Sequence, residues 1–179
     1  MKRLALIVSL VSSFVAAQPA PLEFKGIALG ATIDEVRAKY HVDSCSPGEG
    51  VFAGTERCRI VGVDSFAGVS WPGVTARFRD GVLGTLSVSI PSRDFDAVAT
   101  ALAEKYGRPT SVETPIVQNR MGAQATNAIH RWARKDGGIT AQMYAGNINE
   151  GTVRFVSARE LQAVDQRQGD DAKRRKSDL

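Results

Sequence analysis

The sequence predicts an α+β protein built as a tandem repeat, in which one helix is followed by antiparallel strands and the helices pack on one face of the sheet. Two short amphipathic segments end in the same Lys-Tyr pair, at residues 39–40 and 105–106. Each precedes sequence in which apolar and polar residues alternate, as in half-buried strands. A hairpin turn signal follows each segment, at Asp80-Gly81 and at Asp136-Gly137-Gly138.

The two helices have recognisable ends. In the first, Thr32 and Glu35 have the spacing of a capping box, and Ile33, Val36 and Tyr40 share one face. The second begins near Ser92 as a cap and ends at Gly107. Its apolar stripe consists of Phe95, Val98, Ala99, Leu102, Ala103 and Tyr106.

Strands are predicted around each turn. Val74, Ala76 and Phe78 alternate with polar residues before Asp80-Gly81, and Leu86, Val88 and Ile90 do so after it. Residues 128–135, 139–145 and 152–158 read as three further strands. Tyr40 and Tyr106 lie 66 residues apart, whereas Asp80 and Asp136 lie 56 apart. The extra residues of the first half therefore fall in the stretch around Cys45 and Cys58.

The N-terminus has the pattern of an export signal. Lys2 and Arg3 precede an apolar run, and Val15-Ala16-Ala17 supplies the small residues of a cleavage site. The run is too short to span a bilayer, and no cysteine follows it that could carry a lipid. We expect a cleaved signal over 1–17, a first lobe over 18–91, a second lobe over 92–160, and a polar, disordered tail over 161–179. The protein is then periplasmic or secreted, without a membrane span.

The charge balance argues against a nucleic-acid partner. The chain has 23 Lys and Arg against 19 Asp and Glu, and loss of Lys2 and Arg3 with the signal leaves a small positive excess. The basic cluster at 173–176 could touch an anionic surface weakly. Asp170, Asp171 and Asp178 lie beside it and favour a solvated end of the chain instead.

Cys45 and Cys58 are the two cysteines of the chain. In an oxidising compartment such a pair is most simply a disulfide. A metal site that uses His41 and Asp43 with both cysteines is the alternative, but the usual paired-ligand spacings are missing.

The sequence offers little for catalysis. Its two histidines, His41 and His130, do not neighbour a nucleophile motif, and no glycine-rich phosphate loop is present. We therefore predict no catalytic residues, no metal and no cofactor. An enzyme would require His41 or His130 to lie in a cleft beside a carboxylate or a serine.

The sequence gives more support for a binding surface than for a catalytic site. If helices cover one face of the sheet, the other face is exposed to solvent. The alternation assigns to that face Arg77, Arg79, Thr85, Ser87, Arg131, Gln142, Tyr144 and Arg154. Arginine and tyrosine are enriched at protein–protein hot spots; the alternative is an ordinary solvated sheet face. A pocket between helices and sheet lined by Trp132, Met143 and Tyr144 would instead favour a small ligand.

The segment "GIALGATIDEVRAKY" at 26–40 resembles the opening motif of small bacterial envelope proteins of the SmpA/OmlA type. The tandem plan of helix and strands is similar to that of the β-lactamase inhibitory protein. The chain departs from the first type in lacking a lipidated cysteine and in having one helix before its first sheet instead of two. The resemblance implies a non-catalytic, protein-binding role in the envelope, as an accessory factor, an inhibitor or an immunity-type protein.

Overall fold

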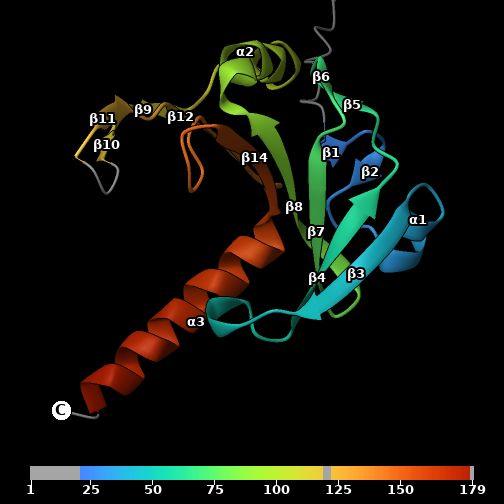
Figure 1. Cartoon of the computed structure of the whole chain (residues 1–179). Coiled ribbons are helices and arrows are strands. Elements are labelled where there is room, and N and C mark those ends of the chain that lie inside the picture. The colour runs from blue at the N-terminus through green and yellow to red at the C-terminus, as the bar shows by residue number, and fades with distance from the viewer. Residues whose placement is uncertain (1–20, 119–121, 178–179) are drawn as a thin grey trace, which may run out of the picture.

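The structure, a computed structural model, describes residues 21–118 and 122–177. The predicted signal segment, 1–17, lies outside the described residues. One eight-stranded antiparallel sheet dominates the molecule (Figure 1). In spatial order its strands are β3 (His41–Pro47), β4 (Thr55–Val61), β7 (Gly73–Arg79), β8 (Val82–Pro91), β14 (Glu150–Ser157), β13 (Gly137–Gln142), β12 (Ile129–Arg134) and β9 (Ser111–Glu113).

The remaining elements are short hairpins and helices around this sheet. The hairpins pair β1 (Glu23–Phe24) with β2 (Ile27–Ala28), β5 (Ser65–Phe66) with β6 (Val69–Ser70), and β10 (Ile116–Gln118) with β11 (Gln124–Thr126). The α-helices are α1 (Ile33–Arg37), α2 (Phe95–Tyr106) and α3 (Ala158–Ser177), and two 3-10 turns are η1 (Gly50–Phe52) and η2 (Ser92–Asp94).

The predicted α+β tandem repeat is wrong. Strand residues outnumber helical ones, and no unit of a helix followed by strands is repeated within residues 21–118 and 122–177. The helix α1 has 5 residues against 12 in α2, and α3 projects away from the sheet instead of packing on its face (Figure 1). Backbone pairing between β8 and β14 joins the two halves into one continuous sheet.

The repeated Lys-Tyr pair has a different explanation. The Tyr40 hydroxyl donates to the carbonyl oxygen of Lys25 at 3.4 Å, and the Tyr106 hydroxyl donates to that of Glu23 at 2.9 Å. The two tyrosines therefore contact the same N-terminal segment, β1 and the turn after it. Similar local sequence here reflects a shared contact.

The C-terminal segment also differs from its prediction. Residues 161–177, expected to belong to a disordered tail, continue α3. The predicted lobe boundary at 91–92 coincides with the end of β8, but strands from both sides of it lie in the one sheet. Polar composition misled the prediction because the helix needs tertiary contacts only in its first turns.

The core lies on one face of the sheet. The predicted alternations are confirmed there, since Val74, Ala76 and Phe78 of β7 are buried, as are their counterparts Leu86, Val88 and Ile90 on β8. Helix α2 covers this face through Phe95, Val98, Ala99 and Leu102. Alternate residues point to opposite faces of a strand, so the other face receives the polar set.

Two local predictions from the sequence are confirmed. The capping box of α1 is complete, because the Thr32 side chain accepts from the Glu35 amide and Glu35 accepts from the Thr32 amide. The turn between β7 and β8 places Asp80 and Gly81 at φ 52° and 74°. This is the left-handed pair of a two-residue hairpin, in which glycine is favoured.

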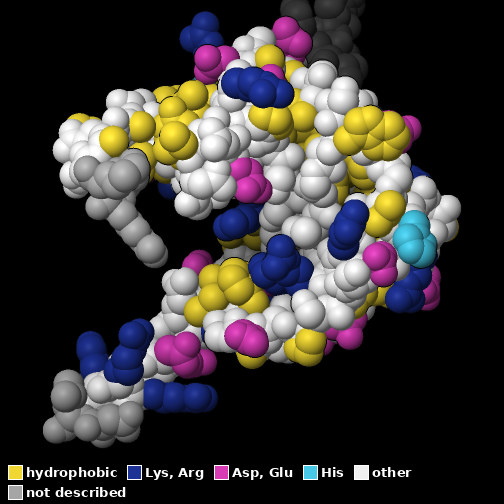
Figure 2. All heavy atoms as spheres, viewed as in Figure 1, with side chains coloured by type: hydrophobic (Ala, Val, Ile, Leu, Met, Phe, Trp, Pro, Cys, Tyr) yellow, Lys and Arg dark blue, Asp and Glu magenta, His cyan; other side chains and the backbone are white. Residues whose placement is uncertain are grey.

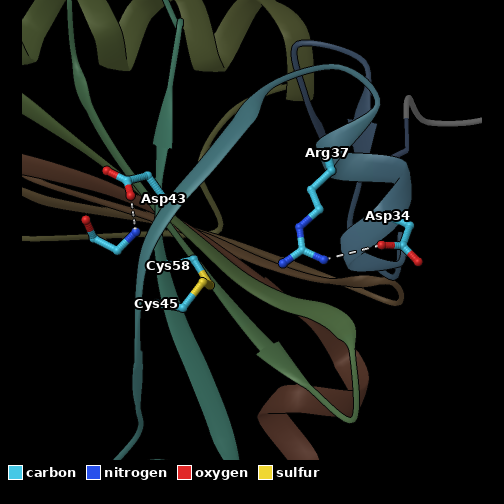
Figure 3. Close-up of a disulfide and its surroundings, with 6 residues drawn as sticks. Asp34, Arg37, Asp43, Cys45 and Cys58 are labelled. Carbon is cyan, nitrogen blue, oxygen red and sulfur yellow. Dashed lines mark hydrogen bonds and ion pairs between the residues drawn. A yellow bond between two sulfur atoms is a disulfide. The ribbon is translucent and has the colours of Figure 1, made fainter.

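The disulfide is confirmed as well. Cys45 and Cys58 are bonded, with an S–S distance of 2.06 Å, and join edge strand β3 to β4 beside a bulge between Asp43 and Ser46 (Figure 3). This bridge is compatible with an exported protein. Among the described residues, no helix is long and apolar enough to cross a membrane.

Candidate binding site on the open face of the sheet

A row of polar side chains crosses the open face of the sheet. The backbone register places these residues opposite one another on successive strands from β4 to β12: Arg59, Thr75, Ser87, Arg154, Thr140 and Arg131. Adjacent strands lie roughly 4.8 Å apart, so six positions of this row extend over about 24 Å. A face of this width exceeds what a small solute would cover.

The centre of this face is hollowed. Twelve residues line an open hollow of about 380 Å³: Phe52, Arg57, Thr75, Ala76, Arg77, Thr85, Ser87, Ser89, Ala145, Glu150, Thr152 and Arg154. Figure 2 shows Lys and Arg side chains gathered on the surface near a notch between the β10–β11 hairpin and α3. We call these twelve residues the basic hollow.

Arg77 is the most constrained cation of the basic hollow. Its guanidinium carbon lies 3.7 Å from the centroid of the Phe52 ring, a cation–π contact that fixes the plane of the group. Its Nε is buried and has no hydrogen-bond partner. Burial lowers the pKa of Arg77, and the positive charge of Arg154 lowers this pKa further.

Arg57 and Arg154 place two further positive charges near Arg77. Arg57 stands directly opposite Arg77 in the β4–β7 pairing, and Arg154 lies opposite Ser87 across β8 and β14. Like charges opposed on neighbouring strands destabilise a sheet. In the part of the chain that the structure describes, none of these three arginines forms an ion pair with a carboxylate.

Arg79, also predicted for this face, is already paired with a carboxylate of the protein itself. Glu160, at the start of α3, accepts from its Nε at 2.7 Å and from a terminal nitrogen at 2.9 Å. The two side chains are 10% and 2% exposed. The Glu160 hydrogen bonds raise the pKa of Arg79. This buried, bidentate pair anchors α3 and leaves Arg79 out of any free binding surface.

The remaining predicted residues lie beside the basic hollow. Arg131 pairs with Glu113 at 3.0 Å, and this contact lowers the pKa of Glu113. Gln142 and Tyr144 line a second, more apolar hollow of about 580 Å³ under the β10–β11 hairpin, with Val117, Ala125 and Ile148. The hollows adjoin through residues 144–150, since Ala145 and Glu150 line the first and Gly146, Asn147 and Ile148 the second.

The pocket expected from Trp132, Met143 and Tyr144 is not assembled. Trp132 is buried in the core, where its Nε1 donates to the carbonyl oxygen of Gly107 at 2.7 Å. Met143 packs against the core from its edge, while Tyr144 faces the second hollow. A different cavity of about 250 Å³ lies between α2 and β1, lined in part by Phe24, Leu102 and Phe155.

The histidines lie apart from the hollows described above. His41 is exposed at the start of edge strand β3. His130 packs edge-on against Phe95, with ring centroids 5.2 Å apart. Within the described ranges, no group of three or more His, Cys, Asp or Glu is arranged to hold a metal ion. At the exposed end of α3, Lys173 of the basic cluster lies 3.8 Å from Asp170.

Sequence reasoning missed Arg57 and Phe52. Both lie in the stretch treated as an inserted loop between the cysteines, whereas Thr55–Val61 forms strand β4. The segment "TERCRIV" does alternate, with Cys58 and Ile60 buried and Arg57 and Arg59 exposed. That pattern could have revealed Arg57. Phe52 lies in the 3-10 turn η1, and no periodicity of apolar residues in the sequence predicts this turn.

The fold and site together define an antiparallel β protein with an open, arginine-rich sheet face. Comparisons with protein-family models, with curated proteins and with solved structures found no match.

Proposed function

We propose that this protein is an exported, periplasmic binding module without catalytic activity, which holds another envelope or exported protein on the open face of its sheet. The observation that carries the proposal is the basic hollow, where Arg77 is stacked on Phe52 and its buried Nε lacks a partner. Arginine is enriched at interface hot spots, and an arginine already held by an aromatic ring loses less side-chain freedom on binding. The surrounding hydroxyls supply hydrogen-bonding groups without adding charge.

Three further features support the proposal. The disulfide between Cys45 and Cys58 suits an oxidising compartment, in agreement with the export signal predicted over 1–17. The motif at 26–40 resembles that of envelope proteins of the SmpA/OmlA type. A sheet face that combines a basic hollow with an apolar one has the mixed chemistry of a protein interface.

Site-directed photo-crosslinking in the native cell tests the proposal. A photoreactive amino acid at Thr140, on the open face, should give one dominant protein adduct in the envelope fraction. The matched control carries it at Thr100, which is exposed on α2, and should give no such adduct. Equal adducts at both positions, or none at Thr140 with the protein folded and exported, would contradict the proposal.

A small-ligand carrier is the second candidate function. The basic hollow, at about 380 Å³, falls within the range of small-molecule sites. A carrier would bind its ligand without a protein adduct at Thr140. Ligand retained through purification and identified by mass spectrometry of the denatured protein would favour this alternative.

A further inference from the structure

Three arginines line the basic hollow, and the hydroxyl residues Thr85 and Ser87 lie on the strand between Arg77 and Arg154. Arg77 on β7 lies opposite Arg57 on β4 and, on its other side, opposite Thr85 on β8. Arg154 on β14 lies opposite Ser87, two residues along β8 from Thr85. Two strand spacings across and two residues along the strand therefore separate the backbones of Arg77 and Arg154, a diagonal of roughly 12 Å. Arginine side chains are long enough to converge across that gap.

The charge balance of the basic hollow is incomplete. Glu150 is the one carboxylate among its twelve lining residues. It lies four residues, roughly 13 Å, along β14 from Arg154. The other nearby carboxylate, Glu160, already gives both oxygens to Arg79. Three cations thus share a partly buried hollow, and Glu160 acts on Arg77 without pairing with it, because Arg79 binds both of its oxygens.

We infer that Arg57, Arg77 and Arg154 form a carboxylate-binding subsite that receives an acidic side chain of the protein partner. A planar guanidinium donates two parallel hydrogen bonds to a carboxylate. Arg77 is suited to this role, because Phe52 covers one face of the group and no carboxylate of the described residues holds its terminal nitrogens, which remain to donate. A bound carboxylate would also relieve the repulsion between the opposed arginines.

The apolar hollow beside the basic hollow indicates that the carboxylate belongs to a protein and not to a free anion. The second hollow, lined by Val117, Tyr144 and Ile148, adjoins the basic hollow through residues 144–150. Ile148 is 58% exposed, in a loop where an apolar contact would cover it. A protein segment with an acidic residue near an apolar one spans both hollows, whereas a free anion fills only the first. The protein source rests on the proposed function; the subsite itself does not.

Nuclear magnetic resonance of the arginine Nε–H groups tests the subsite directly. Glutarate, titrated into the purified protein at constant ionic strength, should shift the Arg77 resonance saturably, with half-saturation at about 1 mM. Arg154→Gln should weaken this response at least about tenfold, the effect of losing one charge-assisted contact. Arg93→Gln, an exposed site on η2, should leave it unchanged. No saturable shift, or an equal loss in the Arg93 variant, would overturn the subsite.

A second arm identifies the source. A labelled peptide in which glutamate alternates with leucine and serine is compared with glutarate and with its glutamine counterpart. The glutamate peptide should bind at least about tenfold more tightly than either, because it covers the apolar hollow as well. Glutarate binding as tightly as the peptide would overturn the protein source. The proposed function fails separately, if the Thr140 crosslink is absent.

Discussion

At the scale of single residues, two arginines on β7 have opposite environments. Arg79 is buried under α3 and bound by both oxygens of Glu160. Arg77, two positions earlier, leaves the strand on the same side but stacks on Phe52 beside other cations, and Glu160 acts on its charge without pairing with it. The residue types are identical, so the difference lies in which element covers each side chain. One arginine therefore serves stability, and we assign the other to binding.

Removing Glu160 should be costly. Glu160→Ala leaves Arg79 buried without its partner, and breaking a buried pair in this way lowers the free energy of unfolding by about 3–5 kcal/mol. Urea denaturation measures the loss. The control is Arg159→Ala, which breaks the exposed pair with Asp80 and should cost less than about 1 kcal/mol. Similar losses in the two variants would mean that Glu160 is solvated.

At the scale of elements, α3 is docked at its start and exposed beyond it. The Ala158 amide donates to the carbonyl oxygen of Asp136 at 3.1 Å, and the Glu160 amide donates to the Ser157 hydroxyl at 3.1 Å. From Gln168 to Lys176 every described side chain is exposed. The helix is thus fixed to the sheet by its first turns, and its far end extends into solvent (Figure 1).

Two glycines should respond oppositely to alanine. Gly84 on β8 lies under α3, where an added Cβ would come within 3.0 Å of Glu160 Oε2 and 3.1 Å of Glu160 Cβ. Gly84→Ala should therefore destabilise the protein by about 1–3 kcal/mol. Gly169→Ala, in the exposed part of α3 with nothing within 4 Å, should increase helicity measured by circular dichroism. Reduced helicity in the Gly169 variant would contradict the assignment of α3.

The turn between β12 and β13 joins three elements through Asp136. Its Oδ2 accepts from the Leu22 amide at 3.1 Å, and its Oδ1 accepts from Arg134 Nε at 2.9 Å. Its carbonyl oxygen receives the amide at the start of α3. The Arg134 hydrogen bond lowers the pKa of Asp136, with help from the Leu22 amide and against the effect of partial burial.

This shift predicts a dependence of stability on pH. A carboxyl whose folded pKa is depressed stabilises the fold above its unfolded pKa, about 3.9, and loses this effect as the pH falls through the folded pKa. Asp136→Asn should therefore be less stable than the native protein at pH 7, and the difference should shrink near pH 3. Urea titrations at both pH values measure it. A difference independent of pH would contradict the ion pair, and Asp64→Asn, on an exposed loop, serves as the control.

The disulfide secures the edge strand β3. Mass spectrometry of the native protein should find no alkylatable thiol. Cys45→Ser/Cys58→Ser should lower the free energy of unfolding by about 3 kcal/mol, because the unfolded chain regains the freedom that the bridge removes. Hydrogen exchange should rise chiefly at β3 and the turn η1. Two reactive thiols in the native protein would contradict the bridge.

At the scale of the whole molecule, one sheet separates two chemistries. Its covered face packs against α2 and the N-terminal hairpin β1–β2, and its open face carries the polar row and the basic hollow. The open face is not uniform, because α3 and η1 cover one end of it and bury Arg79 there. The proposed binding site lies on the part of the open face that α3 leaves uncovered, with Phe52 of η1 in its lining.

Several features could be predicted from the sequence because they depend on neighbouring residues. The alternation at Val74, Ala76 and Phe78 specified which side of β7 is buried, and Asp80-Gly81 specified its turn. The capping box at Thr32 and the disulfide likewise follow from local spacing or from the count of cysteines. Arg77 and Arg154 could be assigned to the open face for the same reason.

The tertiary structure alone decided the rest, because the energies involved arise between distant segments. Backbone pairing of β8 with β14 joins residues 59 to 71 positions apart into one sheet and replaces the expected repeat. The buried pair of Glu160 and Arg79 anchors the start of α3, a segment whose polar composition had predicted a disordered tail. Phe52 meets Arg77 only because β4 turns back beside β7. Periodicity reports which face of a strand is buried, but not which element covers it.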